Sequence, residues 1–125
     1  MKRSRDRQRA LQELLELGPG LESAVDEVSR LAPSLDGPPT VLSRVTVRAA
    51  LDAFARGDLP APLLERWAEA LHTAEDVELA SRDRVFLADA LFQLSTPELF
   101  GPMEEIVAGL LVQASEAADL SSRDA

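Results

Sequence analysis

The sequence predicts an all-α protein, a single compact bundle of five to six helices, from three observations. Apolar residues recur at the spacing of three and four residues that places them on one face of a helix. Short runs that alternate apolar and polar residues, which are typical of half-buried strands, are nearly absent. Glycine and proline mostly stand between the periodic segments, where they begin or end helices. With 125 residues, 46% of them hydrophobic, the chain suits one domain, 1–125, with its own core.

The first two helices are predicted at residues 6–17 and 21–31, and we expect them to form an N-terminal helical hairpin over 1–35. The sequence Gly18-Pro19-Gly20 ends the first helix because neither glycine nor proline favours a helix interior. The second helix has a continuous apolar face. This face consists of Leu21, Ala24, Val25, Val28 and Ala32.

A loop rich in proline and glycine leads into the main bundle, at 40–120, whose first helix is predicted at 40–57 with Thr40 as its N-cap. The charged residues of this helix lie on one narrow stripe with a spacing of four. They are Arg44, Arg48, Asp52 and Arg56. Val41, Val45 and most of its other residues are apolar, so the helix is predicted to lie at the centre of the bundle.

The next helices are predicted at 62–72 and 82–95, followed by a single turn at 96–101 and a last helix from Pro102. Apolar residues cover most of the circumference of the 82–95 helix, which predicts a second central helix. Four aromatic residues are predicted to lie in the core: Phe54, Trp67, Phe86 and Phe92. Phe100, in the turn, is predicted to be partly exposed.

The charge of the chain is unevenly distributed along the sequence. Residues 1–9 carry five basic residues against Asp6, a charge of +4, so the rest carries −13 of the total of −9. An acidic body disfavours nucleic acid as a ligand, because phosphates repel it. It favours a basic protein partner, or it serves solubility alone. The basic residues at 2–9 could contact nucleic acid or an acidic membrane, but the segment is short and has no aromatic residue for stacking, so we interpret it as a solvated helix end.

The densest group of acidic residues is predicted to form a negative patch for binding a partner. Its members are Glu65, Glu69, Glu75, Asp76 and Glu78. Glu65, Glu69 and His72 are spaced i, i+4 and i+7, which places them on one helix face, and the other acids follow directly. The alternative is that these charges only form a solvated face.

The residue types argue against catalysis, and we expect no enzyme activity, no metal and no cofactor. The chain has no cysteine, which excludes disulfides, thiolate zinc sites and a cysteine nucleophile. Its one histidine, His72, lies at a predicted helix end among acidic residues, with no nucleophile that the pattern would pair with it. The acids at 75–78 lack the ligand spacing of a calcium loop, and no glycine-rich phosphate loop is present.

The sequence predicts no association with a membrane. Its longest apolar run, at 106–112, is far shorter than the roughly 20 residues that a membrane-spanning helix needs. No long apolar segment follows the basic N-terminus, so a secretory signal is not indicated and we expect a cytoplasmic protein. Twelve of the thirteen basic residues are arginine, which indicates a GC-rich bacterial genome.

Several short motifs resemble those of a group of small bacterial helical proteins. The motifs are Leu51-x2-Phe54-x2-Gly57-x-Leu59, Leu64-x2-Trp67-Ala68, Asp76-Val77 and Leu91-Phe92-Gln93-Leu94-Ser95-Thr96-Pro97-Glu98-Leu99. In that group a "WA" helix is followed by an acidic turn and an "LFxLxxPE" segment, and some members resemble immunity proteins of polymorphic or contact-dependent toxin systems. The resemblance covers residues 47–103, and the chain departs from it by having Pro60 and Pro62 where a polar cap is usual.

The resemblance implies a non-catalytic binding protein that blocks a toxin. Nuclease toxins are often basic because they hold phosphates, and an acidic inhibitor would be steered to such a target by its charge. The alternative is a homo-oligomeric structural or assembly module, which would pair through the apolar face of the 21–31 helix or through the last helix.

Overall fold

The computed structural model describes residues 2–33 and 39–124, and their side chains over 6–33 and 39–115. Most of this chain is helical, as the sequence predicts. The elements follow one another as α1 (Lys2–Glu16), α2 (Leu21–Arg30), β1 (Thr40–Leu42), α3 (Arg44–Ala55), α4 (Ala61–Thr73), β2 (Val77–Leu79), the short 3-10 turn η1 (Ser81–Asp83), α5 (Arg84–Ser95), α6 (Pro97–Phe100) and α7 (Met103–Asp124). The described residues thus form seven α-helices and one pair of strands, where the sequence predicts five to six helices and no strand.

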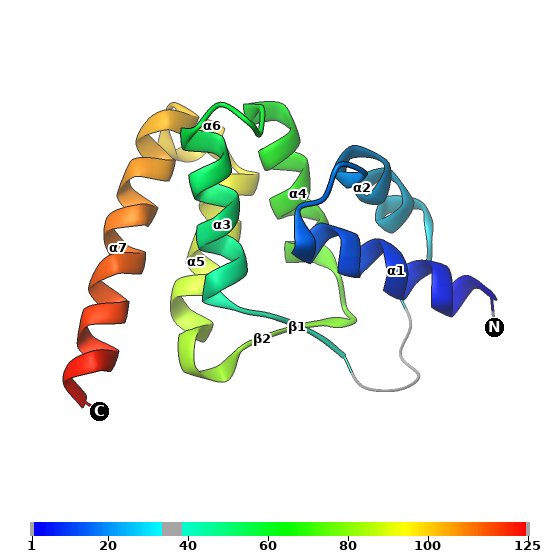
Figure 1. Cartoon of the computed structure of the whole chain (residues 1–125). Helices are drawn as coiled ribbons and strands as arrows, with labels where there is room; N and C mark the ends of the chain where they lie inside the picture. Colours follow the sequence, from blue (N-terminus) through cyan, green and yellow to red (C-terminus); the bar gives the residue numbers. More distant parts are fainter. Residues whose placement is uncertain (1, 34–38, 125) are drawn as a thin grey trace.

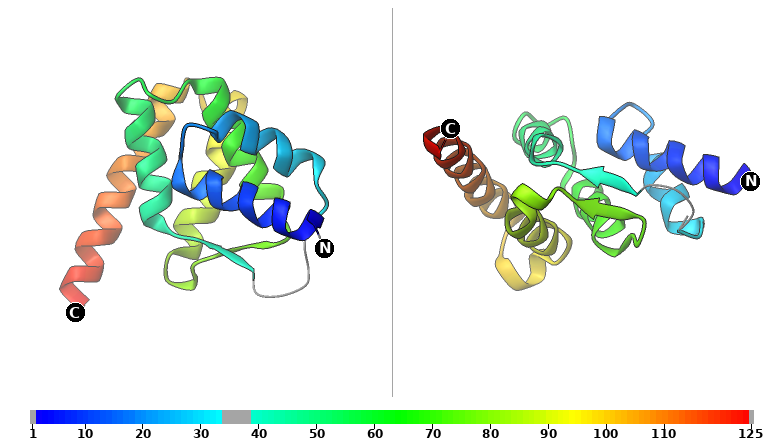
Figure 2. Two further views of the ribbon diagram at one scale, coloured as in Figure 1. Left: turned by 45° about the vertical axis from the view of Figure 1, so that its right-hand side comes forward. Right: turned by 90° about the horizontal axis from the view of Figure 1, so that it is seen from below.

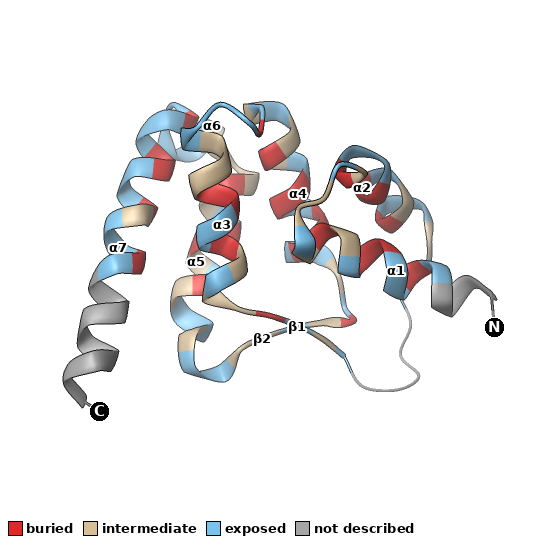
Figure 3. Cartoon of the chain, in the orientation of Figure 1, coloured by how far each residue is buried: buried red, intermediate tan, exposed pale blue. Residues whose placement is uncertain are grey.

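Three helices, α3, α4 and α5, occupy the middle of the molecule, as Figures 1 and 2 show. Helix α7 packs on one side, against α3 and α5, and the α1–α2 hairpin packs on the opposite side, against α4. The buried residues lie on the faces that these helices turn toward one another (Figure 3). The central positions predicted for the helices at 40–57 and 82–95 agree with this arrangement.

The segment Thr40–Leu42 is a strand and not the first turn of a helix, so the predicted helix 40–57 begins too early. It pairs in parallel with Val77–Leu79, and the amide of Thr40 donates to the carbonyl of Asp76 at 3.0 Å. The N-cap of α3 is therefore Ser43, whose hydroxyl accepts from the amide of Thr46, and Thr40 has no capping role.

The later start of α3 also changes where its apolar residues point. Val41 is 52% exposed on the strand pair, and Val45 is 74% exposed in the first turn of α3. The prediction that they belong to the buried part of a central helix is therefore wrong. Helix α3 ends at Ala55, and Gly57 has φ +84°, a left-handed conformation that glycine adopts without strain. The predicted end of this helix at Gly57 is therefore nearly correct.

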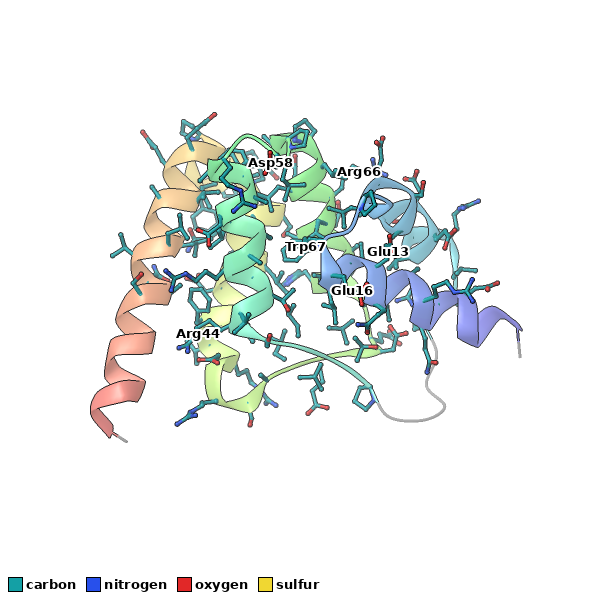
Figure 4. All side chains as sticks on the ribbon, viewed as in Figure 1. Glu13, Glu16, Arg44, Asp58, Arg66 and Trp67 are labelled. Atoms are coloured by element: carbon teal, nitrogen blue, oxygen red, sulfur yellow. The ribbon has the colours of Figure 1, made fainter. Side chains whose placement is uncertain are left out.

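Trp67 of α4 lies at the contact between α4 and the hairpin, between the ribbons of α4 and α1 in Figure 4. The side chain is fully buried, and its indole N–H donates to the carbonyl of Leu14 in α1 at 2.9 Å. This bond satisfies the polar group of an otherwise apolar side chain. The prediction that Trp67 belongs to the core is confirmed.

The phenylalanines agree only in part with the prediction. Phe54 and Phe86 are half-buried and pack against the core, and Phe100 is 42% exposed, as expected for the turn. Phe92 is 41% exposed, so its predicted core position is wrong. Helix α5 carries apolar residues in nearly every direction, and its neighbours cannot cover all of them, which also leaves Val85 85% exposed.

Arg7 and Asp76 form a buried ion pair between α1 and the turn before β2. Their exposed fractions are 3% and 6%. Nε and Nη2 of Arg7 donate to the two carboxylate oxygens of Asp76 at 3.0 and 2.8 Å, a bidentate geometry. Nη1 donates to the carbonyls of Val28 and Leu31, at the end of α2. One guanidinium thereby connects both helices of the hairpin to the turn that leads into β2.

We expect Arg7→Met to lower the free energy of unfolding by about 3–5 kcal/mol, because it leaves the buried carboxylate of Asp76 without its cation. Urea denaturation followed by circular dichroism measures this loss. Arg9→Met, an exposed position of the same helix, is the control and should change stability by no more than about 0.5 kcal/mol. Equal losses in the two variants would contradict the role given to Arg7.

Candidate functional site

The structure divides the predicted acidic patch into two parts and removes one of its members. Asp76 is buried and paired with Arg7, so its carboxylate does not face solvent, and the prediction of Asp76 as a contact residue is corrected here. The reason is a guanidinium 69 positions away in the sequence, which draws the carboxylate inward. Glu65 and Glu69 remain on α4, whereas Glu75 lies in the turn after α4 and Glu78 in β2.

The α4 part of the patch lies beside the end of α5 and the short helix α6. Glu65 is half-buried and lines a groove with Pro97 and Glu98 of α6. One turn beyond Glu69, the exposed ring of His72 lies 6.4 Å from the ring of Phe92, measured between centroids. The face of α4 that carries Glu65, Glu69 and His72 therefore meets α6 at Glu65 and α5 at His72.

Helices α5 and α6 carry a group of exposed apolar side chains, here named the aromatic face. Its members are Phe92, Leu99 and Phe100. The rings of Phe92 and Phe100 pack edge to face, with centroids 5.4 Å apart and planes at 87°. Leu99 is 67% exposed beside them. Edge-to-face packing holds the two rings in place although both remain about two-fifths open to solvent.

The local sequence explains why the aromatic face is held at the surface. The amide and hydroxyl of Thr96 both donate to the carbonyl of Phe92, at 3.1 and 2.6 Å, which ends α5. Pro97 then starts α6 with its fixed φ, and Gly101, at φ +114°, ends it after one turn. This short helix turns the chain back and brings Phe100 against Phe92.

An apolar centre with charged residues around it is the usual composition of a protein-binding surface. Here the apolar group is the aromatic face, and three glutamates lie on α4, which contacts this face through His72, and on α6, which carries Leu99 and Phe100. They are Glu65, Glu69 and Glu98. We take the aromatic face with these glutamates and His72 as the candidate binding surface.

The second part of the predicted patch, Glu75 and Glu78, lies at the other end of α4. Glu78 is exposed and pairs across the strands with Val41, which is also exposed. Nearby, Arg44 at the start of α3 approaches Asp83 at 3.6 Å, an ion pair that joins α3 to η1. The two glutamates therefore add negative charge here without an aromatic centre of their own.

A further hollow of about 520 Å³ lies between the hairpin turn and the end of α3, and the sequence did not predict it. Glu16 and Glu22 line it together with Asp58, and Figure 4 shows Glu16 and Asp58. Arg56 also lines it and bonds to Asp58 at 3.1 Å, which offsets part of the negative charge. This internal pairing makes the hollow a weaker candidate than the surface around the aromatic face.

Two kinds of feature are absent from the residues that the structure describes. No group of three or more histidine, aspartate or glutamate side chains is placed to hold a metal ion within the part of the chain that the structure describes. Over the same residues, no helix combines the length and the apolar character that crossing a membrane requires.

Sequence reasoning missed Phe92, Leu99 and Glu98 as members of the surface and identified Phe100 only as partly exposed. A usable signal was present in the 82–95 segment. A helix that is apolar in every direction has more apolar positions than its neighbours can cover, so at least one of them must face solvent unless the helix is fully enclosed. Phe92 and Val85 are the large apolar side chains of α5 that its neighbours leave exposed.

No model of a known protein family matches the sequence, and neither curated proteins nor solved structures show a match.

The exposed position of Phe92 predicts a clear difference between two adjacent residues. Leu91→Ala removes a side chain that is 1% exposed and should cost about 2–5 kcal/mol of unfolding free energy, whereas Phe92→Ala should cost only about 1–2 kcal/mol. Urea denaturation of the two variants measures both values. A larger loss for Phe92→Ala would mean that its ring belongs to the core and not to a binding surface.

Proposed function

We propose that this chain is a non-catalytic protein-binding domain that captures a basic partner through the aromatic face and its surrounding glutamates. The observation that carries the proposal is the exposed edge-to-face pair of Phe92 and Phe100 beside Glu65 and Glu69. Aromatic side chains at the centre of a patch supply most of the affinity in protein interfaces. Rim carboxylates raise the association rate with a positively charged partner.

The charge of the whole chain supports the same kind of partner. Its formal net charge of −9 attracts a basic protein over distances at which no contact has yet formed. Glu75 and Glu78, which follow the C-terminal end of α4, add to this negative charge. At physiological ionic strength their effect is screened beyond about 8 Å, so the contact residues around the aromatic face dominate.

The specific form of this proposal is an immunity-type inhibitor that binds a basic toxin in the bacterial cytoplasm. The motif resemblance over residues 47–103 suggests it, and the segment that supplies Phe92 and Glu98 is also the longest of the shared motifs. A nuclease toxin presents cationic side chains where it holds phosphates. An acidic surface with an aromatic centre is complementary to such a site.

The test compares variants in the capture of basic proteins from bacterial lysate, followed by calorimetry with the protein identified. We expect Phe92→Ser/Phe100→Ser to weaken binding by about 30-fold or more, as loss of a hot spot does. Glu65→Gln/Glu69→Gln should lower the association rate and reduce its dependence on salt.

The control for this test is Glu22→Gln/Glu104→Gln, which removes the same charge from exposed positions on α2 and α7. This variant should bind like the unmodified chain. If the aromatic and the control variants capture the same protein equally well, the proposed surface is wrong.

A second candidate function is a homo-oligomeric assembly module, in which the aromatic face pairs with a second copy. The observation in its favour is the exposure of Leu99 and the two phenylalanines. Two-fold pairing brings the same patch of each copy together, so the glutamates around one aromatic face would oppose those of the other. This repulsion makes a basic partner the better candidate.

Light scattering separates the two candidates. We expect the chain to remain monomeric at protein concentrations of about 1 mM and physiological salt, because like charges oppose pairing through the aromatic face. A dimer that dissociates on Phe92→Ser/Phe100→Ser substitution would favour the assembly module.

A further inference from the structure

The groove beside the aromatic face is formed where three helices begin. Its volume is about 470 Å³, within the range of pockets that hold small ligands or single side chains. Helix α4 contributes its first two turns, α6 its one turn, and the connection from α6 into α7 the remaining lining residues. The lining residues are Ala61, Pro62, Glu65, Pro97, Glu98, Gly101, Pro102 and Met103.

The chemistry of the lining is unusually uniform. Apart from Glu65 and Glu98, every lining side chain is apolar or absent, and none of the eight residues is basic, a hydroxyl or an amide. The groove therefore has an apolar floor and two carboxylates as its only ionisable groups. Such a site repels anions, and its only side-chain hydrogen-bonding groups are two acceptors, the carboxylates of Glu65 and Glu98.

The two carboxylates have no cationic partner among the side chains that the structure describes. The basic residue next in sequence, Arg66, pairs instead with Asp26 of α2 on the hairpin side, the direction in which Figure 4 shows it. The groove thus keeps its negative charge available.

The helix beginnings around the groove could in principle favour an anion, because a helix N-terminus carries partial positive charge. Two features oppose this. Pro62 and Pro97 have no N–H to donate at these positions, and two full negative charges outweigh the half charge of a helix end.

We propose that this groove receives one long cationic side chain, an arginine or a lysine, of the basic partner. The methylene groups of such a side chain pack on Pro62, Pro97 and Met103 while its charged end bonds to Glu65 and Glu98. The inference rests on the proposed function and names the chemical group that the surface recognises. Since α6 supplies both Glu98 and Phe100, one bound segment reaches the groove and the aromatic face together.

The experiment uses the amide spectrum of the ¹⁵N-labelled full chain, titrated with N-acetyl-arginine amide, N-acetyl-lysine amide and the uncharged N-acetyl-norleucine amide. We expect saturable shifts at Glu65, Glu98, Gly101 and Met103 with the two cations, and a response to norleucine amide that is weaker by about tenfold. The stronger of the two cationic probes identifies which side chain the groove prefers.

Glu65→Gln/Glu98→Gln should weaken the response to the cationic probes by about tenfold or more, because each amide replaces a carboxylate without a change of size. The matched control is Glu75→Gln/Glu78→Gln, which removes the same charge at the other end of α4 and should leave the response unchanged. Thermal melts establish that both variants fold. If both variants weaken the response to the cationic probes equally, the effect comes from the net charge of the protein and not from the groove, and the proposal is overturned.

Two other outcomes would also overturn the groove as a cation site: no shift at its residues, or an equal response to norleucine amide. In either case the proposed function stands if capture of a basic protein still depends on Phe92 and Phe100. Conversely, if the groove binds the cationic probes while capture of the basic protein does not depend on Phe92 and Phe100, the result supports the groove as a cation site but not the proposed role of the aromatic face.

Discussion

The buried pair of Arg7 and Asp76 is the interaction on which the arrangement of the fold depends. Removing a guanidinium and a carboxylate from water costs several kcal/mol per ion, and the structure offsets this cost with four hydrogen bonds from one arginine. Two of these bonds are accepted by the carbonyls of Val28 and Leu31 at the end of α2, where helix carbonyls lack partners within the helix. The other two fix the turn whose carbonyl accepts from Thr40 and sets the register of the strand pair. Strand β1 leads directly to Ser43 and the start of α3, so a side chain in the first helix helps to determine where the third one begins.

Helix α4 separates the structural side of the molecule from its candidate binding side. Toward the hairpin it presents Trp67, bonded to Leu14, and Arg66, paired with Asp26. Toward α5 and α6 it presents the stripe of Glu65 and Glu69. The basic side chain of the helix is therefore used in holding the hairpin, while its acidic side chains remain available to a partner.

Periodicity, and the glycine and proline residues between the periodic segments, predicted most helix positions, because both signals depend on a few adjacent residues. They did not predict the strands, since three residues are too few for an alternating pattern and their partners lie 37 positions away. The spacing of Glu65, Glu69 and His72 correctly placed these residues on one face. Nothing local distinguished Asp76 from Glu75 and Glu78, because its burial depends on Arg7 in another helix. The apolar positions of α5 were evident, but periodicity cannot determine which direction remains uncovered, so Phe92 was assigned to the core.

The position of the single tryptophan gives the molecule an internal optical reporter. Its indole is fully buried, and its N–H bonds to a carbonyl of α1, the helix that lies against it from the hairpin. Separation of the hairpin would hydrate the ring and shift its fluorescence to longer wavelength even if α3, α5 and α7 stayed packed. Emission colour therefore follows the hairpin, whereas the far-ultraviolet signal follows total helix content. Together the two signals would distinguish a local opening from loss of the whole fold.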